Sequence, residues 1–409
     1  MLNRVPNIFL IILLIPIINV SAAILTPLFP PRALNPGVIR GLFLTVFTIW
    51  FLFTQYKSNV FGKITIAFLV YIFTLCWLSD DFNTSIYIFN KVYIASILLL
   101  IGYHYVRNPI RFLLFQRAFL VSLFLLELYV ISANIFGWGF ATYKDDSVFF
   151  GETGVNITKY IVIFVIGIPL YLKTEKDKQY RNLAIVLLFI GVIITFIGMK
   201  RSAILALGFG FVMYSFLTPY KTRLVRSLPL IIVVIFITSP FYLPIILKRF
   251  ESREKKVSMT YANLTQSETE GRVVEVKLTI NETFNAGLDR LLFGYNVFLK
   301  KNYLGHKRML HVDYMNMLGG AGIIGLFLFI FSYFKIYQFI NRIYREMKKY
   351  KYIKELFATA VSLIAVQGLL SIGGTMQGLD LRGAILMNLG ALASISSYYY
   401  LYPNNLEYD

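Results

Sequence analysis

The chain has 409 residues, of which 57% are hydrophobic and 17% aromatic, and its mean hydropathy is +0.66. So apolar a composition leaves too few polar side chains to cover a water-soluble globule, and it predicts a membrane protein. The net charge of +19 is not a nucleic-acid footprint, because much of it follows the membrane topology described below.

The N-terminus has some features of a secretory signal peptide, namely the basic residue Arg4 and the small residues Ser21 to Ala23. The apolar run nevertheless continues to Phe29 without a polar break, so we expect an uncleaved first membrane helix. The single cysteine, Cys76, lies in an apolar stretch and excludes a disulfide framework.

A helix needs about 20 mostly apolar residues to cross the hydrocarbon layer. Runs of this kind predict an all-α polytopic membrane protein of about twelve transmembrane helices. The spans lie near residues 7–28, 38–55, 64–79, 85–104, 118–137, 157–172, 183–199, 203–218, 228–247, 313–334, 355–374 and 383–401.

Lys and Arg concentrate in alternate loops, around residues 57–63, 107–117, 173–181, 221–226 and 342–354. Because basic loops stay on the cytoplasmic side of a membrane, these loops and both termini are expected there. We therefore expect the whole chain to form one integral membrane domain. Residues 1–247 hold the first nine spans, residues 248–312 form a large periplasmic loop with short helices, and residues 313–409 hold the last three spans.

The long loop is far longer than an ordinary connection between helices, which favours a functional role. Within it, the spacing of polar and apolar residues from Glu268 to Leu288 predicts an amphipathic helix at the membrane surface. Motifs of soluble enzymes, such as a phosphate-binding glycine loop, a metal-ligand pair or a nucleophile elbow, are missing from the sequence. Neither a metal nor a cofactor is therefore expected.

Candidate chemistry then rests on isolated polar residues at the outer face of the membrane. Of the three histidines, His104 is expected at a cytoplasmic helix end in a structural role, which leaves His306 and His311. His311 precedes the tenth span, where Tyr314, Leu318, Gly322 and Gly325 share one helical face. The glycines favour close approach of another helix, so a packing role for this face and a functional role for His311 are both open. Asp313 could cap the helix or orient His311.

Basic residues on the outer side run against the topology rule and are candidate ligands for an anion. Lys200 and Arg201 lie between two short spans, where guanidinium donors and a helix N-terminus suit a phosphate. The alternative to an anion site is that the arginine side chain only extends its charged group to the membrane–water interface. Arg272 opens the predicted amphipathic helix and could instead be part of a solvated basic face.

Two charged residues lie inside predicted spans, Lys91 in the fourth and Glu127 in the fifth. A charge at the centre of a membrane helix costs about 2.5 to 3.5 kcal/mol on insertion scales. Both side chains are therefore expected to face the interior of the bundle, either as a buried ion pair or as substrate-binding groups.

The order of these residues resembles the O-antigen polymerase and O-antigen ligase superfamily of bacterial surface-polysaccharide assembly, most clearly from about residue 195 to 330. The matching motifs are Lys200-Arg201-Ser202-Ala203 at a short helix junction, Gly271-Arg272 and Leu291-Leu292-Phe293-Gly294 in the long loop, and the pattern from His311 through Asp313, Tyr314 and Leu318 to Gly322-Ile323-Ile324-Gly325.

The resemblance implies a metal-independent glycosyltransferase of the bacterial inner membrane, with an active site facing the periplasm. Its substrates would be oligosaccharides on undecaprenyl pyrophosphate, with Arg201 and Arg272 binding the pyrophosphate. His311 would deprotonate or orient the acceptor hydroxyl, or bind the leaving phosphate as a cation. Lys200, Asp313, Tyr314, Lys91 and Glu127 are further candidates for substrate contact. Membrane lipids and a chain-length regulator protein are candidate partners, and nucleic acid is not.

Two departures from the family pattern favour a polymerase over a ligase, which would transfer the glycan to lipid A-core. Lys200 replaces the usual serine before the junction arginine, and His311 is followed by Val312 and Asp313 where ligases more often have an asparagine. A flippase of lipid-linked sugars is the alternative from another class, although such transporters commonly show repeated halves.

Overall fold

The computed structural model describes residues 7–29, 35–140, 148–198, 200–220, 243–244, 247, 271–298, 301–303, 306–308, 310–374 and 378–406. Nine helices in this part of the chain are long and apolar enough to cross a membrane. They are α1 (Asn7–Leu25), α2 (Pro36–Thr54), α3 (Val60–Trp77), α4 (Phe82–Tyr105), α5 (Pro109–Phe136), α6 (Ile157–Thr174), α7 (Lys178–Ile197), α12 (Asp313–Glu346) and α13 (Lys351–Ile372). The chain is an all-α multi-pass membrane protein, as its composition predicts.

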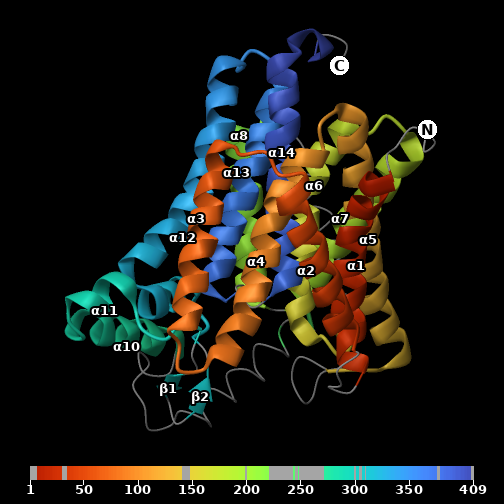
Figure 1. The fold of residues 1–409 in the computed structure, drawn as a ribbon. Coiled ribbons are helices and arrows are strands. Elements are labelled where there is room, and N and C mark those ends of the chain that lie inside the picture. The colour runs from red at the N-terminus through yellow and green to blue at the C-terminus, as the bar shows by residue number, and fades with distance from the viewer. Residues whose placement is uncertain are drawn as a thin grey trace.

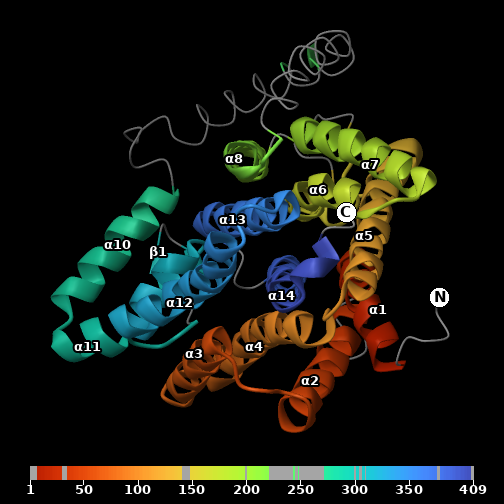
Figure 2. The same ribbon diagram turned by 90° about the horizontal axis from the view of Figure 1, so that it is seen from above.

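Two further helices of the described residues belong to the bundle. The first, α8 (Arg201–Leu217), is apolar but shorter than the nine. The second, α14 (Leu379–Leu401), lies in the middle of the bundle and is buried along most of its length (Figure 2). Glycines allow α4 and α14 to approach closely, since a side chain on Gly390 would overlap the Leu99 carbonyl oxygen and one on Gly102 would overlap the Met387 carbonyl oxygen.

Every predicted span coincides with a helix except the one near 228–247, which lies almost wholly outside the described residues. Two of these helices are longer than their apolar runs. Helix α5 begins at Pro109, where the Asn108 side chain accepts a hydrogen bond from the Arg111 N–H and so caps the helix. Helix α12 continues to Glu346 beyond its apolar part.

The bundle has two distinct ends (Figure 1). Helix α1 begins and α14 ends at the upper end, here called the C-terminal end. The lower end, here called the hairpin end, carries the antiparallel strands β1 (Lys301–Tyr303) and β2 (His306–Arg308). Helices α10 (Gly271–Asn285) and α11 (Leu288–Phe293) lie beside α12 near the hairpin end and run across the direction of the bundle (Figures 1 and 2).

The amphipathic helix predicted for 268–288 corresponds to α10, but its polar face is buried and its apolar face is exposed. Where the structure describes the side chains of this helix, the buried ones are polar and follow helical spacing, namely Glu275, Thr279 and Thr283. Leu278 and Phe284 are exposed instead. An outward apolar face is what a helix in the membrane interface needs, and the polar face is thereby turned toward the protein.

Helix α12 is interrupted at Gly322, where φ is +66° and the backbone is not helical. The end of α11 packs into this break, because a side chain on Gly322 would overlap the Leu292 carbonyl oxygen. The Tyr295 N–H donates to the Gly319 carbonyl over 3.3 Å, and the Tyr71 hydroxyl donates to the Ala321 carbonyl over 2.8 Å. These bonds satisfy carbonyl groups that an interrupted membrane helix would otherwise leave without partners.

Candidate functional site

The candidate site lies at the hairpin end, where the chain enters α12. His311 is about half exposed, whereas the Glu275 side chain of α10 is only 1% exposed. Glu275 Oε1 lies 3.1 Å from His311 Nδ1, and its Oε2 accepts the His311 backbone N–H over 2.8 Å and the Val312 N–H over 3.3 Å. The carboxylate thus holds both the backbone and the ring of His311.

This contact determines which ring nitrogen is available for chemistry. A carboxylate only accepts hydrogen bonds, so Nδ1 carries a proton and donates it to Glu275. Nε2 is then the nitrogen left to face a substrate, as a base when the ring is neutral and as an acid when it is protonated. The buried carboxylate also stabilises the positive ring that forms when Nε2 takes a proton.

The contact corrects the expected role of Asp313. The cap residue of α12 is Val312, so Asp313 is the first helical residue and not the cap. Asp313 is buried, and its negative charge in the first turn suits the positive end of the helix dipole. Glu275, and not Asp313, takes the position at Nδ1 that orients His311.

A glycine turn connects His311 to the rest of the bundle. At Gly374, just after α13, φ is +80°, and a side chain there would overlap the His311 carbonyl oxygen. The Lys159 ammonium of α6 is buried and donates to the carbonyl oxygens of Gly373 and Gly374 over 3.3 and 3.4 Å. The turn is thus held from the core on one side and supports His311 on the other.

The same turn reaches the N-terminus of α8. A Cβ placed on Gly373 would lie 3.4 Å from Ser202 Cβ and 3.5 Å from Lys159 Nζ. Arg201 is the first residue of α8 and is exposed, and Lys200 occupies the cap position. The predicted helix N-terminus at Arg201 is confirmed. The Gly373–Gly374 turn lies between this N-terminus and His311.

Arg272 lies in the first turn of α10, three residues before Glu275. Residues three apart are neighbours along a helix, so the backbone of α10 brings the Arg272 position within one turn of the residue that holds His311. His306 lies in β2, where it pairs with Tyr303.

The Tyr314 side chain connects two helices of the bundle, and its contact with a substrate stays a prediction. Its hydroxyl donates to the Gly368 carbonyl of α13 over 3.0 Å, and its ring meets Phe329 edge-on at 6.0 Å. The hydroxyl thereby ties the first segment of α12 to α13. This is the packing role that the spacing of this helical face left open.

Lys91 and Glu127 do not form an ion pair. Lys91 is partly buried, with its ammonium 4.3 Å from the centre of the Tyr87 ring. Glu127 is buried beside Gly191 of α7, and neither carboxyl oxygen has a hydrogen-bond partner among the described residues. His104 is structural as expected, because its Nε2 accepts the Lys57 N–H and its Nδ1 lies 3.1 Å from the Leu100 carbonyl oxygen.

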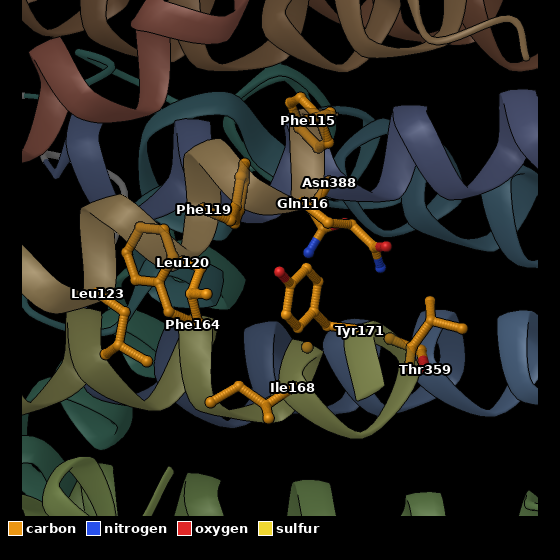
Figure 3. Close-up of a pocket in the computed structure, with 12 residues that line it drawn as sticks. Phe115, Gln116, Phe119, Leu120, Leu123, Phe164, Ile168, Tyr171, Thr359 and Asn388 are labelled. Carbon is orange, nitrogen blue, oxygen red and sulfur yellow. The ribbon is translucent and has the colours of Figure 1, made fainter. Parts of the chain in front are cut away.

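A cavity of about 30 Å³ lies elsewhere, between α5, α6, α13 and α14 (Figure 3). Its lining includes the polar side chains of Gln116, Tyr171, Thr359 and Asn388. Such a volume has room for about one water molecule and not for a sugar. Over the described residues, no three His, Cys, Asp or Glu side chains are grouped as a metal site.

Sequence comparison supports the membrane class and goes no further. The model of the YfdI N-terminal transmembrane domain matches residues 147–293, a little over a third of the chain. The matched segment contains Arg201, Arg272 and Glu275 and ends before His311. No curated protein matches the chain.

Proposed function

We propose that the chain is a polymerase of surface polysaccharide that joins oligosaccharide repeat units carried on undecaprenyl pyrophosphate at the periplasmic face of the bacterial inner membrane. The observation that carries the proposal is the buried Glu275 carboxylate on His311 Nδ1, which leaves Nε2 of a half-exposed ring for the substrate. The residues lie at the entrance of a membrane helix, a depth that both a lipid-linked phosphate and a sugar hydroxyl can reach.

In the proposed reaction, an acceptor hydroxyl attacks the anomeric carbon of the growing glycan from the side opposite the pyrophosphate. The new glycosidic C–O bond forms as the C–O bond to pyrophosphate breaks, so the anomeric configuration inverts. The hydroxyl proton passes to His311 Nε2, and the bonding electron pair leaves with the pyrophosphate. Fixed cations near the leaving group lower the barrier because negative charge grows there.

Arg201 and Arg272 are the proposed cations. Arginine stays charged and offers a planar fork of N–H groups that fits phosphate oxygens in pairs. The exposed position of Arg201 at the start of α8 and the position of Arg272 one turn before Glu275 support this assignment. Lys159 supports the turn between the N-terminus of α8 and His311 and is a positioning residue in this proposal.

The test is a deletion strain complemented with variants, with surface glycan length and membrane protein level measured side by side. His311→Ala should preserve the protein level but reduce the glycan to single repeats, because a positioned acid or base contributes about 10²- to 10⁴-fold in rate. Arg201→Lys and Arg272→Lys should also fail at normal abundance. Full-length polymer from a stable His311→Ala protein would refute the proposal, and loss of all glycan transfer would indicate a ligase or a flippase.

A further inference from the structure

A second polar cavity lies at the C-terminal end, opposite the candidate site. Its volume is about 200 Å³, and it lies between the start of α1, the end of α4 and the start of α5. The residues that line it are Ile8, Phe9, Gln55, His104, Tyr105, Arg107 and Arg111. We call it the basic cavity, because two of these residues are cationic and none is acidic.

Positive charge converges on this cavity from several directions. The charge of Arg107 acts on both Arg111 and His104, and the charge of Lys57 also reaches His104. Helix α5 begins at Pro109, so the positive end of its dipole adds to the same field. Like charges held this close repel one another, and a bound anion would remove the repulsion.

The cavity also presents hydrogen-bond donors to such an anion. Arg111 uses Nη1 to donate to the Tyr105 carbonyl over 3.2 Å, and its guanidinium lies 5.2 Å from the centre of the Phe9 ring. An arginine carries five N–H groups in a fork that suits phosphate oxygens. His104 is not a donor here, since both ring nitrogens have partners.

The surroundings indicate that the anion is the headgroup of a lipid. One wall of the cavity is apolar, formed by Ile8 and Phe9. From it, the exposed side chains of Ile11 and Leu14 continue along α1, and Ile110 is exposed on the adjoining α5. The volume is smaller than the roughly 300 Å³ typical of sites that enclose a whole small molecule, whereas a phosphate could bind inside while acyl chains leave along the apolar surface.

We propose that the basic cavity binds the phosphate of an anionic phospholipid, with the guanidinium groups of Arg107 and Arg111 as donors and the acyl chains against α1 and α5. The proposal is independent of the reaction at His311. It assigns a lipid-binding site to a part of the chain that the proposed glycosyl transfer does not use.

Native mass spectrometry of the full-length protein in detergent tests the proposal, with phosphatidylglycerol and phosphatidylcholine added in separate titrations. The parent protein should retain one phosphatidylglycerol in preference to phosphatidylcholine. The double variant Arg107→Gln/Arg111→Gln should bind it about 30-fold more weakly, since each basic residue near a membrane surface is worth roughly 1 kcal/mol. Equal retention by the double variant, or equal retention of phosphatidylcholine, would overturn the proposal.

Two controls distinguish a specific site from a general loss of positive charge or of folding. The variant Lys348→Gln/Lys349→Gln removes the same charge from exposed positions beyond the end of α12 and should leave retention unchanged. If the double variant does not fold, Arg107→Gln alone, which changes an exposed side chain, should weaken retention about fivefold, since one basic residue near a membrane surface is worth roughly 1 kcal/mol. Inorganic phosphate that displaces the lipid at equal concentration would show a site for free anions and refute the lipid assignment.

Discussion

The Glu275 carboxylate and the His311 ring lie in contact although 36 positions separate the two residues in the sequence. Oε1 meets Nδ1 at 3.1 Å, while Oε2 accepts two backbone N–H groups from the segment that leads into α12. One buried carboxylate thereby positions the backbone and selects the ring nitrogen that donates to it. The arrangement matches the requirements of a histidine that exchanges a proton with a substrate.

Glu275→Gln is expected to reduce glycan polymerisation by about 10²- to 10⁴-fold while protein abundance stays close to normal. The amide can present its N–H₂ group to Nδ1, which favours the wrong tautomer of His311. Glycan length and membrane protein level, measured for this variant in the deletion strain, check the prediction.

The control for Glu275 is Glu282→Gln, which changes an exposed carboxylate on the same helix. This variant should polymerise normally. If Glu275→Gln polymerised as well as Glu282→Gln, the contact with Nδ1 would have no part in the reaction.

The bundle could be predicted from the sequence because lipid imposes apolar runs of fixed length on each span. The positions of Arg201 and His311 at helix starts were predictable for the same reason. The role of Glu275 was not predicted, although Glu275 lies in the segment EGRVVE three positions after Arg272. The amphipathic pattern of 268–288 indicated a polar face toward water, whereas the structure turns Glu275, Thr279 and Thr283 inward. Their spacing of four residues was the available signal.

The glycines around α12 show the same limit. The spacing of Gly322 and Gly325 predicted the close approach of another helix, and α11 does approach Gly322. The spacing did not predict that Gly322 adopts a positive φ and interrupts the helix. Such a break depends on a partner elsewhere in the chain, here Leu292 to Tyr295. The turn at Gly373 and Gly374 was likewise missed, since its contacts with Lys159 and His311 are set by tertiary packing.

Gly374→Ala is expected to disturb the site more than the bundle. A residue with a side chain pays about 1 to 2 kcal/mol for the left-handed backbone conformation, and the added methyl group would displace the His311 carbonyl. We expect loss of polymer with the protein still in the membrane. Gly208→Ala in α8 is the matched control, because no atom lies within 4 Å of its Cβ position. Equal activity of the two variants would contradict a role for the turn.

Tyr71→Phe is expected to lower stability by about 1 to 3 kcal/mol. The change leaves the Ala321 carbonyl at the break in α12 without its 2.8 Å hydrogen bond. Thermal unfolding of the purified protein in detergent measures the effect. Tyr87→Phe removes a hydroxyl from an exposed residue of α4 and should be neutral. An unchanged unfolding temperature for Tyr71→Phe would show that another group satisfies the carbonyl.

Lys91→Met and Glu127→Gln are expected to change stability independently of each other. The two side chains have no contact, with Lys91 over the Tyr87 ring and Glu127 against α7. The effects of unconnected residues add within about 0.5 kcal/mol, whereas a buried pair would show a coupling energy of up to about 3 kcal/mol. Thermal unfolding of the two single variants and the double variant gives the coupling energy directly.

The stability of the C-terminal end should fall at low pH through Glu175, which follows α6. Burial alone would raise the pKa of Glu175, but hydrogen bonds from Arg117, the Asp177 N–H and Tyr171 outweigh burial and lower this pKa to about 2. Arg117 binds the carboxylate through two nitrogens, over 2.7 and 3.0 Å. Because the folded-state pKa lies below the unfolded value, the contribution to stability is complete above about pH 5 and is lost as the pH falls toward 2.

Glu175→Gln should therefore unfold at a lower temperature than the parent at pH 7, and the difference should be nearly the same at pH 5 and clearly smaller at pH 3.5. Arg117→Gln removes the charged partner while Tyr171 and the Asp177 N–H still donate to the carboxylate, and it should cost about 1 to 3 kcal/mol at pH 7. A difference between parent and Glu175→Gln that stayed constant from pH 7 to 3.5 would show that the carboxylate is not ionised through this ion pair.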